Sequence, residues 1–220
     1  MSVTLRPAVA ADLPFLVWSM REASTSHLER SVWSMVLGLS DEYVSELLGA
    51  VATAEHPHWC HLSRFRVAEV DGSAVAAASS YDPVSEGNDV LFAEAVQILA
   101  RAGAAPESVQ QAMRHAMIVD GVTPKPYPDA WGIENVAVVP EHRGVGLAAL
   151  LLDAAVADAR SHGREHVQIM CLDGNDRAQR AWERAGFSVR AEYRGRECGE
   201  LLGANGMKLL VRDVAAMQPV

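Results

Sequence analysis

The residues in this chain with the clearest types and spacing for chemistry are Arg143, Gly144 and Gly146. They lie between a strand-like apolar run, residues 133–139, and a helix-like run, residues 147–160. Glycine leaves backbone N–H groups open to a ligand, and a helix N-terminus adds unpaired N–H donors and the positive end of its dipole. A strand, a glycine turn and a helix in this order predict a site that binds phosphate.

Two kinds of domain use such a turn. Gly144-Val145-Gly146-Leu147-Ala148-Ala149 satisfies the dinucleotide fingerprint G-x-G-x-x-G/A. That fingerprint needs its glycines directly after a strand, within a repeated βαβ unit. Here Pro140 to Arg143 intervene, and the residues after the turn have room for only about three more strands. The spacing therefore disfavours a dinucleotide-binding oxidoreductase.

A second pattern includes more of the chain. Arg143-x-x-Gly146-x-Ala148 matches the motif R/Q-x-x-G-x-G/A, and residues 175–187 match N-x-x-A-x-x-x-Y-x-x-x-G-F except at Trp182. Over residues 131–195, and more weakly over 3–82, the chain resembles the GCN5-related N-acetyltransferases (GNAT superfamily). The resemblance implies an α/β (α+β) fold, a mixed and mostly antiparallel twisted sheet with helices on both faces. It also implies transfer of acetyl from acetyl-CoA to a primary amine by direct attack in a ternary complex.

The same resemblance implies which residues bind acetyl-CoA. The glycine turn would hold the pyrophosphate through its backbone, and the strand before it would bind the pantetheine arm. An alternative role for Asn175 is a helix cap, which asparagine favours. The residues predicted to bind acetyl-CoA are Val136, Ala137, Val138, Arg143, Gly144, Val145, Gly146, Leu147, Ala148, Asn175, Ala178 and Trp182.

Glu134 is the candidate general base. It lies in an otherwise apolar strand, where a carboxylate is costly to bury unless it is paired or neutral. Partial burial would raise its pKa toward the working pH, as suits a base acting directly or through water. The alternative is a glutamate at the strand edge that faces solvent or an arginine.

Trp182 departs from the family pattern, which has a tyrosine that protonates the leaving thiolate. An indole N–H cannot donate that proton as a phenol can. Either the thiolate leaves unprotonated, or Tyr193 or Tyr127 serves as the acid, and we take Tyr193 as the catalytic candidate. The alternative is an acyl-CoA-binding sensor or a catalytically weak relative.

Two other groups could suggest chemistry. The segment 56–61 contains three histidines and Cys60, but it lacks the paired ligand spacing of a zinc site, so we expect no metal. Cys171 could be an acyl-accepting nucleophile, although a buried cysteine is usually a small apolar residue.

Local patterns predict the elements that position these residues. We expect helices beginning near Asp12, Ser26 and Ser40 or Asp41, and a hairpin of strands 65–70 and 74–80 joined by Asp71-Gly72. A helical hairpin is expected as an insertion at about residues 84–130, flanking the acceptor site or a dimer interface. The remaining predicted elements are strands 3–6, 166–172, 187–193 and 207–211 and a helix over 176–185.

Composition limits the remaining possibilities. The 220 residues are half apolar, enough for one domain spanning 1–220, and no apolar run is long enough to span a membrane. Three widely spaced cysteines and no signal pattern indicate a cytoplasmic protein. A net charge of −9 argues against nucleic acid and favours a small amine over a protein N-terminus as acceptor. A homodimer is possible.

Overall fold

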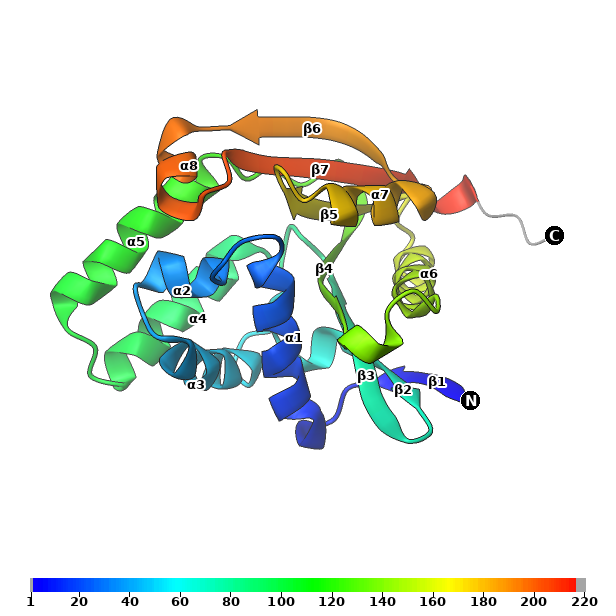
Figure 1. Ribbon diagram of the computed structural model, residues 1–220, viewed down its shortest axis with the longest axis horizontal. Coiled ribbons are helices and arrows are strands. Elements are labelled where there is room, and N and C mark those ends of the chain that lie inside the picture. The colour runs from blue at the N-terminus through cyan, green and yellow to red at the C-terminus, as the bar shows by residue number, and fades with distance from the viewer. Residues whose placement is uncertain (1, 217–220) are drawn as a thin grey trace.

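The computed structural model describes residues 2–216, which form one seven-stranded sheet with helices on both faces (Figure 1). The strand order is β1-β2-β3-β4-β5-β7-β6, and only the central pair β4–β5 is parallel. This is the mixed, mostly antiparallel arrangement that the sequence predicted. The strands are β1 (Val3–Pro7), β2 (Phe65–Val70), β3 (Ser73–Tyr81), β4 (Ala130–Val138), β5 (His166–Leu172), β6 (Ser188–Arg194) and β7 (Gly206–Asp213).

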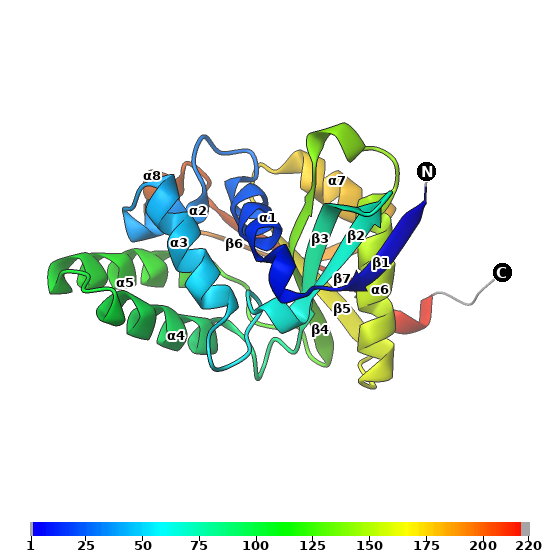
Figure 2. The same ribbon diagram turned by 90° about the horizontal axis from the view of Figure 1, so that it is seen from below.

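The helices form two layers, which Figure 2 shows on either side of the sheet. α6 packs on β2 to β5 through leucine and alanine side chains, while α1 crosses the opposite face of β3 and β4 and packs on α3. The helices are α1 (Leu13–Thr25), α2 (Val32–Leu37), α3 (Asp41–Ala52), α4 (Asn88–Arg101), α5 (Pro106–Asp120), α6 (Leu147–Ser161), α7 (Asp176–Arg184) and α8 (Arg196–Leu202). None of these described helices is long and apolar enough to cross a membrane.

The central parallel pair is short. β4 and β5 pair only from Ala130↔His166 to Ile133↔Ile169, and the rest of β4 has no partner on that side. Just beyond the last pair, Asn135 has φ +56°, a left-handed conformation that asparagine tolerates better than most residues. The β3–β4 register also shifts between Ala77 and Ser79, as at a β-bulge. The bulge turns β4 away from β5 and opens the middle of the sheet.

Hydrogen bonds on three sides hold the Asn135 bulge. Its Nδ2 donates to the Trp59 carbonyl at 3.2 Å and to Ser79 Oγ at 3.1 Å, and its own carbonyl accepts from Ser19 Oγ at 3.0 Å. These bonds tie α1, the segment before β2 and strand β3 to one point of β4. The tertiary structure therefore compensates for the unusual backbone conformation.

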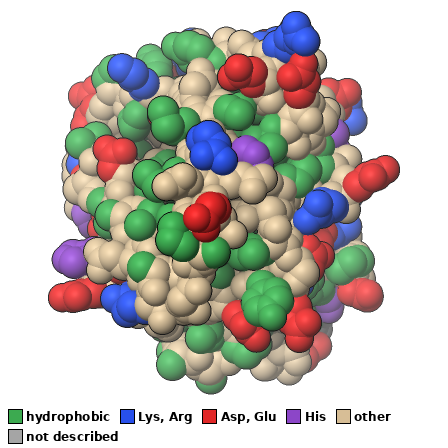
Figure 3. Space-filling model, turned by 90° about the vertical axis from the view of Figure 1, so that its left-hand side faces the viewer, with side chains coloured by type: hydrophobic (Ala, Val, Ile, Leu, Met, Phe, Trp, Pro, Cys, Tyr) green, Lys and Arg blue, Asp and Glu red, His purple; other side chains and the backbone are tan. Residues whose placement is uncertain are grey.

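The predicted helical insertion is present as α4 and α5, between β3 and β4. α4 packs on α3, and α5 packs on α2 and α8. The helical spacing of its apolar residues predicts that Ala112, Met113 and Met117 of α5 face inward. Of these three, only Ala112 is buried, while Met113 and Met117 are 51% and 73% exposed. Figure 3, which faces this side of the molecule, shows hydrophobic side chains on the surface among charged ones. Helix α5 contacts the body of the protein through one narrow side, so its methionines face outward.

The prediction that Ser26 caps the second helix is wrong. Ser26 ends α1, with φ +55°, and α2 begins only at Val32. Ser31 is the cap, because its hydroxyl accepts the backbone N–H of Ser34 at 3.1 Å. Both serines have suitable side chains, and the packing of α2 against α5 and α8 favours the later start.

Candidate active site

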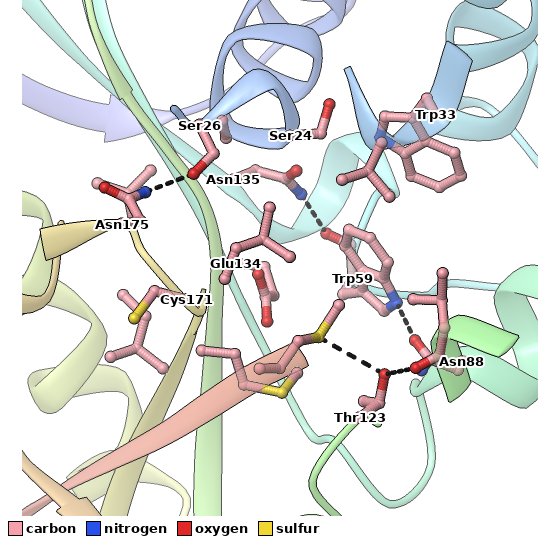
Figure 4. Close-up of a pocket in the computed structure, with 18 of the residues that line it drawn as sticks. Ser24, Ser26, Trp33, Trp59, Asn88, Thr123, Glu134, Asn135, Cys171 and Asn175 are labelled. Atoms are coloured by element: carbon pink, nitrogen blue, oxygen red, sulfur yellow. Dashed lines mark hydrogen bonds between the residues drawn. The ribbon is translucent and has the colours of Figure 1, made fainter. Parts of the chain in front are cut away.

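A cavity of about 260 Å³ lies where β4 and β5 part (Figure 4). One end is lined by β5 and α7, including Cys171, Asn175 and Trp182. The other end is lined by α2, the segment before β2 and the α4–α5 hairpin. The hairpin therefore borders the cavity, while its expected place beside the acceptor site or a dimer interface stays a prediction.

Glu134 lies between these two ends, with its carboxylate directed into the cavity (Figure 4). Among residues 2–216, it is the only acidic or basic side chain on the cavity wall, and none of those residues donates a hydrogen bond to it. Desolvation raises its pKa from 4.5 to about 8, because a buried carboxylate loses hydration and gains no compensating partner. This is the raised pKa that the sequence predicted for Glu134.

Tyr81 lies beside Glu134 and was not identified from the sequence. It ends β3 opposite Gly132, so its ring shares a sheet face with Glu134. A Cβ on Gly132 would lie 2.7 Å from two carbons of that ring, so the glycine makes room for it. Burial raises the pKa of the Tyr81 phenol, with the nearby Glu134 carboxylate adding to the effect. The phenol therefore keeps its proton at neutral pH.

The glycine turn lies at the start of α6. Gly144 and Gly146 have φ +83° and +93°, and a Cβ at either would meet no atom within 4 Å. Glycine is needed here for its backbone conformation. The exposed turn leaves the N-terminus of α6 open, as a phosphate-binding site requires.

Arg143 does not point freely toward that turn. Its Nε donates to the Val138 carbonyl at 3.0 Å, and its Nη2 lies 2.6 Å from Glu22 Oε1 on α1. The guanidinium therefore ties the turn to the end of β4 and to α1. Of the neighbouring predicted residues, Val136 lines the cavity and Ala137 is buried in the sheet.

Asn175 has the helix-cap role that we gave as its alternative. Its Oδ1 accepts the Ala178 N–H at 3.0 Å, and its Nδ2 donates to Ser26 Oγ at 2.6 Å, joining α7 to the end of α1. Ala178 and Trp182, on the same helix, also line the cavity. The Trp182 side chain is buried, and its indole nitrogen has no hydrogen-bond partner among the described residues.

The structure does not bring the predicted acid Tyr193 to Glu134. Tyr193 is on β6, outside the cavity wall, and is 50% exposed. Tyr127 also lies outside the wall, packed edge-on against His166 at 5.1 Å between ring centroids. Cys171 does line the cavity, but burial raises its pKa to about 11, which keeps the thiol protonated and a poor nucleophile.

Other parts of the cavity wall could not be identified from the sequence. Neutral polar and aromatic side chains come from segments far apart in the chain, because only tertiary packing brings them together. Asn135 had a usable signal, since asparagine is uncommon inside strands and tolerates left-handed backbone. The unpredicted wall residues with polar or aromatic side chains are Ser24, Ser26, Trp33, Trp59, Tyr81, Asn88, Phe92, Thr123 and Asn135.

The chain matches the family model described as "Acetyltransferase (GNAT) family" over residues 33–187. This match covers more than half of the sequence, and the chain belongs to that family. It is therefore an acyltransferase. No curated protein matches the chain in sequence.

Solved structures share the fold at low sequence identity. An N-acetyltransferase from Staphylococcus aureus Mu50 is 16% identical, with 94% of this chain and 99% of that chain covered and a TM-score of 0.67. An agmatine N-acetyltransferase is 14% identical, with 97% and 100% covered and a TM-score of 0.57. YncA from Salmonella typhimurium, solved with its cofactor acetyl-CoA, is 17% identical, with 100% and 98% covered and a TM-score of 0.53.

Proposed function

We propose that this protein transfers the acetyl group of acetyl-CoA to a primary amine, with Glu134 as the general base. The observation that carries the proposal is the isolated Glu134 carboxyl in the cavity between the separated strands, with a pKa raised to about 8. A base with a pKa near the working pH is the most effective proton acceptor. A primary ammonium must lose a proton before its nitrogen can attack.

The donor side has groups that fit acetyl-CoA. The glycine turn and the start of α6 offer backbone N–H groups to a pyrophosphate. The part of β4 after Ile133 does not pair with β5, so its remaining backbone groups are open to an amide-bearing arm, although the Asn135 and Val138 carbonyls already accept side-chain hydrogen bonds. A structural neighbour, YncA, was solved with acetyl-CoA. These features support acetyl-CoA as the donor, with the thioester between β4 and β5.

Starting from the ammonium form, the reaction needs three proton movements. The ammonium first loses one proton to Glu134, which passes it to solvent. The amine nitrogen then bonds to the acetyl carbonyl carbon as the carbon–sulfur bond breaks, and the nitrogen's second proton passes to Glu134. The departing sulfur leaves as a thiolate, which takes a proton. We assign that donation to Tyr81, whose phenol lies on the wall beside Glu134, in place of Tyr193, which lies outside the wall. Trp182 has no transferable proton.

A second function, acyl-CoA binding without efficient turnover, is favoured by Trp182 alone. One experiment separates the two. The protein is incubated with acetyl-CoA and a panel of primary amines, and the release of thiol and the formation of amide are measured. Turnover of an amine supports the enzyme, whereas thermal stabilisation by acetyl-CoA with no turnover of any amine supports the binding protein.

A further inference from the structure

We infer that the acceptor is a small primary amine whose remaining part is uncharged and apolar, aromatic or short aliphatic, with no carboxylate and no second cationic group. The inference rests on the proposed function, because it assumes that the amine reaches Glu134 from the side opposite α7. It is drawn from the chamber that forms this end of the cavity, which contains Trp33, Trp59, Leu91, Phe92, Ala116 and Val119.

The charge of the chamber wall is the first reason. Within the described part of the chain, no arginine, lysine or histidine lines the cavity, and Glu134 is its only acidic group. A substrate carboxylate would be buried without a partner and close to Glu134, which is unfavourable. A second ammonium group would also have no carboxylate of its own to bind. The wall therefore favours an amine with a single charge, the one that Glu134 removes.

Two acidic side chains of α4 and the segment before it do not change this conclusion. Glu86 forms an ion pair with Arg64, and Glu94 lies 2.5 Å from His56 Nδ1. Both acids line a separate surface depression on the other side of α4, outside the cavity wall. They are already paired and face away from the chamber.

Aromatic rings are the second reason. Trp33 and Trp59 stack with centroids 5.8 Å apart and an interplanar angle of 28°. Trp59 is fixed at both ends, because its Nε1 donates to Asn88 Oδ1 at 3.1 Å and its carbonyl accepts from Asn135, the neighbour of Glu134. These rings provide a rigid apolar wall for a ring or alkyl chain.

The size of the cavity is the third reason. A dry cavity of about 150 Å³ is large enough for benzene, and this cavity of about 260 Å³ also includes the end beside β5 and α7. One ring with a short chain fits the remaining space. A peptide N-terminus is larger than one ring with a short chain, and each added residue would bring further backbone N–H and C=O groups that need partners.

A matched pair of acceptors tests the inference. Phenethylamine and phenylalanine have the same ring and amine, but only phenylalanine has a carboxylate. Hexylamine and agmatine form a second pair that differs in the distal cation. We expect kcat/KM to be at least ~100-fold higher for the uncharged member of each pair, since an unpaired buried charge is strongly disfavoured. Equal rates, or a preference for phenylalanine or agmatine, would overturn the inference and leave the acetyltransferase assignment intact.

Substitution of Phe92 tests whether the acceptor binds in the chamber. Phe92→Ala removes the ring that α4 contributes to the chamber wall and leaves Glu134 in place. We therefore expect the KM for phenethylamine to rise about 10-fold, with the KM for acetyl-CoA unchanged. Val96→Ala is the matched control, because Val96 lies one helical turn further along α4 and is outside the wall. Equal effects of the two variants would refute the chamber as the acceptor site.

A measurement of amine binding tests the inference without relying on catalysis. Quenching of tryptophan fluorescence by phenethylamine and by phenylalanine is compared for the protein saturated with CoA. Preferential binding of phenethylamine supports the inference, and equal or weaker binding refutes it. If acetyl-CoA binds and none of the four amines is acetylated, the proposed function fails, while the binding comparison still decides which ligands the chamber admits.

Discussion

Replacing Glu134 with glutamine should make the protein less active and more stable, by an amount that grows with pH. The pKa of Glu134 is raised from 4.5 in an unfolded chain to about 8 in the fold. Between these values the unfolded chain has lost a proton that the folded protein keeps, so stability falls as pH rises. Below the unfolded-state pKa, Glu134 is protonated in both states and stability is unaffected. Above the folded-state pKa, the full loss in the free energy of unfolding is present.

The expected size follows from the linkage between pKa and stability. Each pH unit within this window removes about 1.4 kcal/mol from the free energy of unfolding. From about pH 5.5 to about pH 8 the loss is therefore roughly 3 kcal/mol. This is an upper limit, because Glu134 is only partly buried and keeps some contact with solvent. Glutamine has no charge to desolvate, so Glu134→Gln avoids the loss.

The assay is thermal unfolding of both proteins across this pH range. For a chain of this size, a change of 1 kcal/mol in the free energy of unfolding shifts Tm by about 2–4 °C. At about pH 8 the Tm of Glu134→Gln should therefore exceed that of the wild type by up to about 10 °C. Glu46→Gln is the control, because Glu46 is exposed on α3, and its Tm difference should be small and constant. A Tm difference for Glu134→Gln that does not change with pH would refute the raised pKa.

Kinetics provide the matching functional result. The wild-type kcat/KM should rise with pH and level off near pH 8, since the deprotonated carboxylate is the active form. Glu134→Gln should lower kcat/KM by about 10²–10⁴-fold and remove this rise. Full activity in the variant would exclude Glu134 as the base, even if the stability prediction held.

Three further substitutions test separate parts of the site. Gly146→Ala, at φ +93°, should lower the free energy of unfolding by about 1–2 kcal/mol and weaken acetyl-CoA binding. Its control is Gly163→Ala, at φ +68° beyond the other end of α6, which should lose similar stability with the Kd for acetyl-CoA unchanged. Equal Kd values for both variants would contradict a role for the turn. Asn135→Ala removes the hydrogen bonds to Trp59 and Ser79. It should lower the free energy of unfolding by about 2 kcal/mol and strongly reduce kcat. A wild-type kcat would show that the bulge is not needed for catalysis. Tyr81→Phe keeps the ring over the sheet and should lower kcat more than KM, with little change in Tm; an unchanged kcat would mean that the thiolate leaves without this proton.

Much of the fold could be predicted because its signals are local. Asp71-Gly72 indicated the β2–β3 hairpin, and helical spacing with Gly103 and Pro106 indicated the inserted helices. The glycine turn and the segment 175–187 indicated the family. Glu134 was also identifiable, since a carboxylate within an apolar strand is unusual enough to suggest a function.

The acceptor side depended on the tertiary structure. Trp33, Trp59 and Phe92 come from three separate segments, and no spacing in the sequence relates them. The place of Tyr81 beside Glu134 depends on its pairing opposite Gly132, and Tyr193 was plausible as the acid only while its place outside the cavity wall was unknown. The sequence by itself determined the local elements and the donor turn, since their signals lie within a few residues. The position of Tyr81, the proposed acid, and the charge and shape of the proposed acceptor chamber were decided only by long-range packing, which brings distant segments together around the opening between β4 and β5.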